Sequence, residues 1–230
     1  MTGLFLSCEH GGNQVPPELQ HCFAGHEDVL GTHRGHDIGA LDLFHRLVPL
    51  AAASKFTTLS RLCIEMNRSE GHRQLFSAFT QELGPGPKQH LLALYRSYRE
   101  AITGDIQARI AAGTTVLHVA VHSFTPVLDG VVRTVDIGLL YDPARAAERA
   151  LCRKWSGAIQ RRRPGLVVRM NQPYKGVSDG LPTALRKVFP THYAGVELEV
   201  NQRFASHNRM DRQLASVLHD SLAEVLAQGW

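Results

Sequence analysis

The sequence predicts an α/β fold of three layers, α/β/α, with a mixed, mostly parallel central sheet. Short segments rich in β-branched and apolar residues alternate along the chain with longer segments of helical spacing. This alternation is typical of a sheet covered by helices on both faces. The 230 residues, 43% of them hydrophobic, are enough for one sizeable core, and no repeat or linker divides them. We therefore expect a single domain over residues 1–230.

Apolar runs and helical spacing place the individual elements. The predicted strands cover residues 3–10, 55–67, 114–123, 135–142, 165–171 and 194–202. The predicted helices cover residues 38–53, 88–112, 143–163 and 209–227. Asp142 is placed to cap the third helix, and a proline follows it at the first helical position. The Gly/Pro-rich segment 83–88 is expected to be a surface loop.

Composition and charge exclude several classes of protein. No apolar run is long enough to span a bilayer and the N-terminus does not resemble a signal peptide, so we expect a soluble, cytoplasmic protein without a membrane partner. The four cysteines are scattered without a CxxC pair, which argues against a disulfide framework or a thiolate zinc site. The formal charge of +4 is dispersed apart from residues 160–165, an expected helix end, so nucleic acid is not an expected partner.

Polar residues collect where the predicted strands end. The segments that follow the strands read "SCEHGGN", "EMNRS", "HSFTP", "YDP", "NQPYKG" and "VELEVNQ". In open α/β sheets, ligands bind at the carboxyl ends of the strands. The sequence therefore predicts one functional site along this edge of the sheet.

Two histidines at strand ends predict a metal centre. His10 and His122 each end an apolar run and are followed by small or hydroxyl residues. Neutral imidazole is the commonest zinc ligand, and a catalytic zinc site takes three protein ligands. We expect a carboxylate as the third, and Asp37 is our first choice, although it is also placed to cap the next helix. Asn13 is a weaker candidate. We expect one Zn²⁺ per chain, with another divalent metal as the alternative.

Two carboxylates alternate on one face of the last predicted strand. Burying Glu197 and Glu199 in an otherwise apolar strand is costly unless they have partners or a function. One of them is a candidate general base for a metal-activated water. The alternative is that both lie on the solvent-facing side of an edge strand.

Cationic and aromatic residues near the strand ends are candidates for binding substrate. Arg68 and Arg133 can each bind a carboxylate through two hydrogen bonds, which lysine cannot do. Asn67 lies beside Arg68, Tyr174 can offer a hydroxyl group to the substrate, and Asn13 is a further candidate for binding it. The expected partner is therefore a small molecule that carries a carboxylate.

The ordered set of motifs resembles the N-formylglutamate amidohydrolase family. The motifs are "SCEHGGNQVP", "HDIGA", "RLCIEMNRS", "VHSFTP", "DIGLLYDP", "NQPY" and "VELEVNQ", over about residues 5 to 203. The family is related in fold to the zinc carboxypeptidases and aspartoacylases, so the resemblance implies a zinc-exopeptidase-like fold. It also implies His10 and His122 as zinc ligands, Glu199 ahead of Glu197 as the base, and the Asn67–Arg68 pair as the carboxylate-binding group.

One motif departs from the pattern of these relatives. Asn13 fills the position of the glutamate in their His-x-x-Glu zinc motif, where that glutamate opens the helix after the first strand. In this chain residues 14–36 are inserted before the helix, which Asp37 then opens. This topology favours Asp37 as the third ligand, with Asn13 or His36 as the alternatives.

These features predict a zinc-dependent hydrolase that cleaves the amide bond of an N-acyl amino acid such as N-formylglutamate. The expected mechanism is attack by a metal-activated water with a glutamate as general base. The alternative, motivated by Asn13, is a non-catalytic metal-containing protein that binds an anionic amino-acid derivative.

Overall fold

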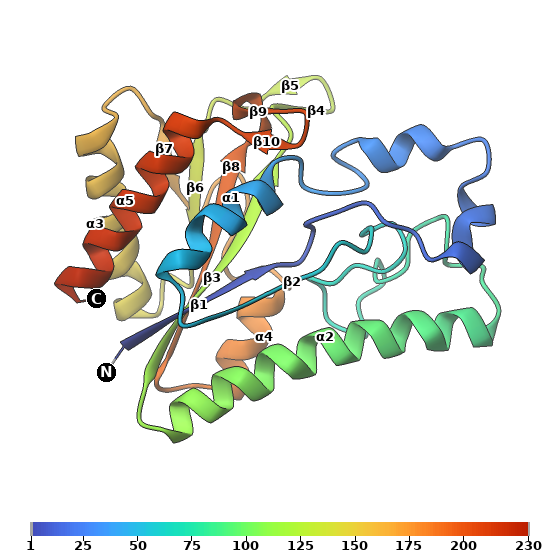
Figure 1. Ribbon diagram of the computed structural model, residues 1–230, viewed down its shortest axis with the longest axis horizontal. Helices are drawn as coiled ribbons and strands as arrows, with labels where there is room; N and C mark the ends of the chain where they lie inside the picture. The colour runs from blue at the N-terminus through green and yellow to red at the C-terminus, as the bar shows by residue number, and fades with distance from the viewer. Residues whose placement is uncertain (1, 230) are drawn as a thin grey trace.

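A six-stranded central sheet lies between two layers of helices (Figure 1). The computed structural model describes residues 2–229. The sheet contains β1 Thr2–Cys8, β2 Ala53–Phe56, β3 Thr115–Phe124, β6 Ile137–Leu140, β7 Val168–Met170 and β8 Tyr193–Asn201, in the order β2–β1–β3–β8–β6–β7. Neighbouring strands are parallel except β6 and β8, which are antiparallel. The predicted mixed, mostly parallel sheet is confirmed.

Five helices cover the two faces of this sheet. They are α1 Ala40–Leu47, α2 Pro85–Ala111, α3 Ala146–Arg162, α4 Leu181–Val188 and α5 Arg212–Gln228. One hydrophobic core joins α1, α3 and α5 to the sheet, and a second joins α2 and α4 to its other face. Short 3-10 helices cover Pro17–Phe23, Glu27–Gly31, Val48–Leu50 and Gln202–Phe204. Two small hairpins pair β4 Val127–Leu128 with β5 Val131–Val132, and β9 Ala205–Ser206 with β10 Arg209–Met210.

The helices form where apolar residues recur at helical spacing. In α1 the buried residues are Ala40, Leu43, Phe44 and Leu47, which form one stripe that faces the sheet. The α1 helix follows Gly39, whose φ of 80° favours glycine and whose added Cβ would lie 2.8 Å from that of Ala205. Across residues 2–229, no helix is both long and apolar enough to cross a membrane.

Alternation along β3 turns its two histidines to the face opposite two core valines. In β3, Val119 and Val121 pack in the core beneath α1, α3 and α5, so His118 and His122 point to the opposite face. The register of β3 and β8 pairs His122 with Glu199. Polar side chains from different strands are therefore neighbours on one face of the sheet.

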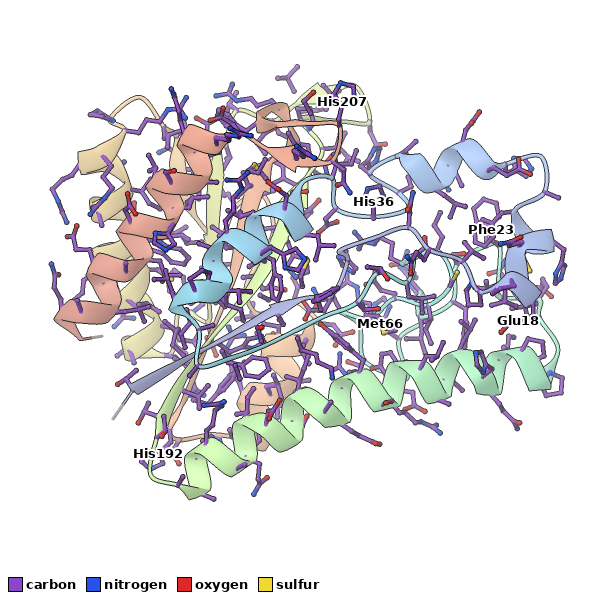
Figure 2. All side chains as sticks on the ribbon, viewed as in Figure 1. Glu18, Phe23, His36, Met66, His192 and His207 are labelled. Carbon is purple, nitrogen blue, oxygen red and sulfur yellow. The ribbon has the colours of Figure 1, made fainter. Side chains whose placement is uncertain are left out.

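The predicted strand over residues 55–67 is wrong beyond its first two residues. β2 pairs with β1 only over Ala53–Phe56, and the chain then continues through turns. The apolar side chains that suggested a strand, such as Ile64 and Met66, are buried in the second core, which also contains Phe23 (Figure 2). The apolar run thus reflects burial of a loop and not strand pairing.

Two predictions about helices also need correction, and one helix was missed. The helix predicted over 38–53 ends at Leu47 and continues only as a 3-10 turn that contains Pro49, since proline lacks the N–H of a regular helix. Asp142 does not cap α3; its carboxylate accepts a hydrogen bond from the backbone N–H of Ala144, before the helix begins. The α4 helix was not predicted, because its eight residues are too few for a clear periodic pattern.

Candidate active site with a metal-ligand cluster

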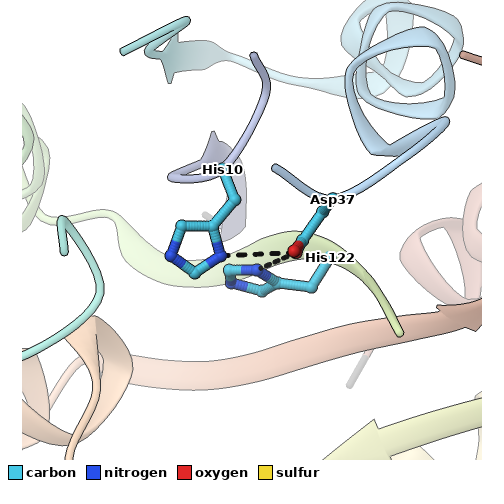
Figure 3. A group of neighbouring side chains, drawn as sticks. All are labelled: His10, Asp37 and His122. Atoms are coloured by element: carbon cyan, nitrogen blue, oxygen red, sulfur yellow. Dashed lines mark hydrogen bonds and ion pairs between the residues drawn. The ribbon is translucent and has the colours of Figure 1, made fainter. Parts of the chain in front are cut away.

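Three side chains from distant parts of the sequence meet at the carboxyl ends of β1 and β3 (Figure 3). They are His10, Asp37 and His122; all are buried, and one ligand atom from each lies within 4.8 Å of the others. The Oδ2 atom of Asp37 lies 3.3 Å from Nδ1 of His10 and 3.0 Å from Nδ1 of His122. These three residues are the set that the sequence suggested as ligands.

The backbone around Asp37 explains why its carboxylate faces the histidines. Its N–H donates a hydrogen bond to the carbonyl oxygen of His10 at 3.0 Å, which ties the segment before α1 to the end of β1. The residue that caps α1 is Gly39, so the Asp37 side chain is not used as a helix cap. It is therefore free to contact both imidazole rings.

The two alternative third ligands lie elsewhere. The Asn13 side chain is exposed and does not line the cavity beside the histidines. His36 is buried, but its Nδ1 lies 3.1 Å from the carbonyl oxygen of Leu30 and its ring does not line the cavity either (Figure 2). Among the three candidates, only Asp37 adjoins His10 and His122.

Each histidine of the cluster also faces a carboxylate through its other ring nitrogen. Nε2 of His10 contacts Oε1 of Glu65, and Nε2 of His122 lies 3.1 Å from Oε2 of Glu9. Arg61 ion-pairs with Glu65 and, at 3.1 Å, with Asp37. A carboxylate on the far nitrogen is the usual way in which proteins orient a metal-binding histidine.

The charges of the cluster shift the pKa values of its members and of the neighbouring Glu9. Burial favours the neutral form of His122, but the carboxylates of Asp37 and Glu9 outweigh it and raise its pKa well above the ordinary value. Burial raises the pKa of Asp37, yet His10 and His122 hold it well below its usual range. Burial also acts against ionisation of Glu9, but its contact with His122 lowers the Glu9 pKa to about 2. Asp37 and Glu9 are thus anionic carboxylates that attract positive charge to this site.

The cluster opens into a cavity of about 240 Å³. Its lining residues are His10, Asp37, Arg61, Glu65, Asn67, Arg68, His122, Ser123, Leu140, Tyr174, Lys175, Ser178, Asp179, Glu197 and Glu199. The cluster therefore lies in a cleft lined mostly by polar and charged side chains, which suit a small polar ligand.

The two glutamates of β8 have different environments in this cavity. Nδ2 of Asn67 donates a hydrogen bond to Oε1 of Glu197 at 3.0 Å. Glu199 is 6% exposed, and its Oε2 atom is buried without a hydrogen-bond partner among the described residues. Burial, together with the nearby charges of Asp37 and Glu197, raises the Glu199 pKa to about 8. Glu199 thus offers a free oxygen next to the cluster, whereas Glu197 is already engaged.

The candidate substrate-binding residues fall into two groups. Arg68 lines the cavity, and its Nη1 donates a hydrogen bond of 2.5 Å to the carbonyl oxygen of Asp179. Tyr174 also lines the cavity. Arg133 is not a lining residue; it donates a hydrogen bond of 2.9 Å to the Tyr174 hydroxyl and packs over the Phe124 ring. Arg133 therefore contacts a lining residue of the cavity but does not line the cavity itself.

Sequence reasoning missed several residues of this site. The unpredicted residues are Glu9, Arg61, Glu65, Lys175, Ser178 and Asp179. Glu65 carried a usable signal, because a lone charge within the apolar run "LCIEM" needs a partner when it is buried. Arg61 and Lys175 carried none, since isolated basic residues in polar segments are usually solvated.

The donors of the cluster suit a divalent metal ion. Two imidazole nitrogens and one carboxylate oxygen are a common ligand set of catalytic zinc, and the buried carboxylates supply the negative charge that a cation needs. Near these three groups, the buried Oε2 atom of Glu199 has no hydrogen-bond partner among the described residues and adds a further free oxygen. The residues present therefore fit a metal ion.

Comparisons with known proteins agree with this description. The crystal structure of gene product Atu2144 from Agrobacterium tumefaciens has the same fold, with a TM-score of 0.79 and 24% sequence identity over 99% of this chain and 91% of that one. No curated protein is significantly similar in sequence. The family model for N-formylglutamate amidohydrolase matches residues 2–205. This chain belongs to the N-formylglutamate amidohydrolase family.

Proposed function

We propose that this chain is a zinc-dependent amidohydrolase that cleaves the amide bond of an N-acyl amino acid such as N-formylglutamate. Membership of the family supports hydrolysis of N-formylglutamate. The His10–Asp37–His122 cluster supports a metal in the site, with these three residues as its ligands. When bound, zinc polarises a carbonyl group and lowers the pKa of a water molecule. The residues of the chain supply the remaining chemistry.

The unpaired oxygen of Glu199 carries its choice as general base, and two further observations agree with it. It is paired with the metal-ligand candidate His122 across β3 and β8, it lines the cavity, and its buried Oε2 atom is unpaired. Glu197 is instead occupied by Asn67. We assign to Glu199 the removal of a proton from the attacking water and its transfer to the nitrogen of the leaving amine.

The burial of Glu199 also controls whether its carboxyl group is ionised. Burial raises its pKa to about 8, which favours the protonated acid near neutral pH. Positive charge added to the cluster of His10, Asp37 and His122 stabilises the carboxylate form and lowers this pKa. Glu199 is therefore a more effective base when the cluster carries a cation.

Arg68 is the proposed binding residue for the substrate carboxylate. Only its Nη1 is engaged, with the carbonyl oxygen of Asp179, so further N–H groups are available in the cavity. Asn67 is held at both ends, since its Oδ1 accepts a hydrogen bond from the N–H of Leu181 and its Nδ2 donates to Glu197. We assign to Asn67 one remaining N–H for the substrate.

The proposal is tested with matched variants of the two glutamates. We expect Glu199→Gln to lower kcat for N-formyl-L-glutamate by about 10²- to 10⁴-fold, the usual effect of losing a general base, while its zinc content is unchanged. Glu197→Gln is the control, because it makes the same change on the same strand and leaves the base in place. Formate release measures turnover, and elemental analysis measures zinc.

Two results would contradict the proposal. Full activity of Glu199→Gln would remove the glutamate from the mechanism, and wild-type protein without zinc would remove the metal. Zinc-containing wild-type protein that binds N-formyl-L-glutamate, yet hydrolyses no N-acyl amino acid, would instead support the non-catalytic alternative.

A further inference from the structure

We propose that Glu9 is a positioning residue of the metal centre, which orients His122 and supplies a negative charge behind it. Glu9 is fully buried and does not line the cavity, so it cannot touch a substrate there. It acts through His122, one of the three ligands in the proposed function, on which this inference rests.

The contact between Glu9 and His122 leaves one ring nitrogen for the metal. Oε2 of Glu9 and Nε2 of His122 lie 3.1 Å apart. Neither atom has an aligned hydrogen bond within residues 2–229, so this ion-pair contact is the interaction that each makes. A proton on Nε2 then faces Glu9, and Nδ1, which donates a hydrogen bond to Oδ2 of Asp37 at 3.0 Å, is the nitrogen that would exchange its proton for a metal.

Glu9 differs from Glu65, the carboxylate behind His10. Glu65 is neutralised by an ion pair with Arg61. Among the described residues, no lysine or arginine forms an ion pair with Glu9, whose other oxygen accepts a hydrogen bond from the Tyr98 hydroxyl at 3.1 Å. The cationic partner of Glu9 is therefore the imidazole of His122, and the fold alone gains little from this buried pair, because burying both groups costs about as much as their attraction returns.

The negative charge of Glu9 favours the binding of a cation at the cluster. A divalent ion with one ligating carboxylate, Asp37, keeps one net positive charge. The Glu65–Arg61 pair adds none, so the carboxylate of Glu9 behind His122, together with that of Glu199 in the cavity, offsets the charge that remains. Removal of the Glu9 charge should therefore weaken metal binding, both through the orientation of His122 and through the charge itself.

The test measures the metal affinity of Glu9→Gln. Zn²⁺ affinity is obtained by competition with a chromophoric chelator, and the Co²⁺ absorption spectrum reports the geometry at the metal. We expect zinc affinity to fall about 10- to 100-fold and the Co²⁺ spectrum to change. Thermal unfolding of the metal-free variant should show a cooperative transition, which separates a loss of zinc affinity from a loss of folding.

Two tyrosine variants supply the control and the second test. Tyr193→Phe removes a buried hydroxyl that lies 2.8 Å from Nδ1 of His118, on the same face of the sheet, and should keep wild-type zinc affinity. Tyr98→Phe removes the hydrogen bond to Glu9 but keeps the charge, so its affinity should lie between those of wild type and Glu9→Gln.

Wild-type zinc affinity in Glu9→Gln would overturn the inference. If that variant does not fold, unchanged affinity in Tyr98→Phe would overturn it instead. Wild-type protein that binds no zinc contradicts the proposed function as well, whereas tight binding by wild type and Glu9→Gln alike contradicts this inference alone.

Discussion

Replacement of Glu148 by glutamine should destabilise the protein by about 3 kcal/mol. Glu148 lies in α3 and is fully buried. Its Oε1 accepts hydrogen bonds from Nε of Arg186 in α4 and from the N–H of Gly195 in β8, each at 3.0 Å. The carboxylate thus joins two helices to the strand that carries Glu199.

The expected loss of stability follows from the charge of Arg186, which the variant leaves without its partner. Breaking a buried ion pair by removing one partner costs about 3–5 kcal/mol, because the other charge stays buried without compensation. Arg186 is 8% exposed, but it still donates hydrogen bonds to the carbonyl oxygens of Gly176 and Gly195. These hydrogen bonds partly compensate the charge of Arg186, and we therefore expect a destabilisation at the lower end of this range. For a chain of this length, about 3 kcal/mol lowers Tm by about 6 to 12 °C.

Thermal and urea unfolding of the metal-free protein measure this change. Glu224→Gln is the matched control: its carboxylate also pairs with arginines, Arg161 and Arg162, but on the surface, and its loss should leave Tm almost unchanged. Arg186→Gln and the double variant complete a cycle whose coupling energy reports the pair. A Tm shift as small as that of the control would refute the view that buried charge holds α3, α4 and β8 together.

Two further predictions concern acid stability and backbone packing. Burial lowers the pKa of His118 to about 4 from 6.5, so the unfolded chain binds the extra proton between these values and stability falls as pH drops from 6.5 to 4. By about 1.36 kcal/mol per pKa unit, we expect His118→Gln to change the pH dependence of unfolding by about 3 kcal/mol over this range; parallel curves for variant and wild type would contradict this. Gly138→Ala places a Cβ atom 2.1 Å from the carbonyl oxygen of Gln172 and 3.2 Å from Cβ of Glu199. It should lower both Tm and turnover, and a fully active, equally stable variant would show that this packing is not required.

The sequence alone determined the parts of the fold that depend on local patterns. Apolar runs located the central strands β1, β3, β6 and β8, and helical spacing located α2, α3 and α5, because burial on one face imposes a period that is visible in a short segment. The same patterns failed over residues 55–67, since a buried loop and a buried strand have the same apolar content.

The candidate site was predictable in composition but not in arrangement. Strand-end positions indicated His10 and His122, and alternation indicated a glutamate of β8. The sequence left both Glu197 and Glu199 open; in the structure Asn67 contacts Glu197, whereas Oε2 of Glu199 is buried without a partner among the described residues. That contact spans 130 positions of the chain, so no local pattern contains it.

Only the tertiary structure decided which groups share the site. Asp37, rather than Asn13 or His36, lies beside the two histidines because its backbone is tied to the end of β1. Glu9 became visible as the partner of His122 only when strand order placed β1 next to β3. Periodicity records whether a residue is buried, whereas the identity of its neighbours depends on strand order and register, which form through contacts between distant segments.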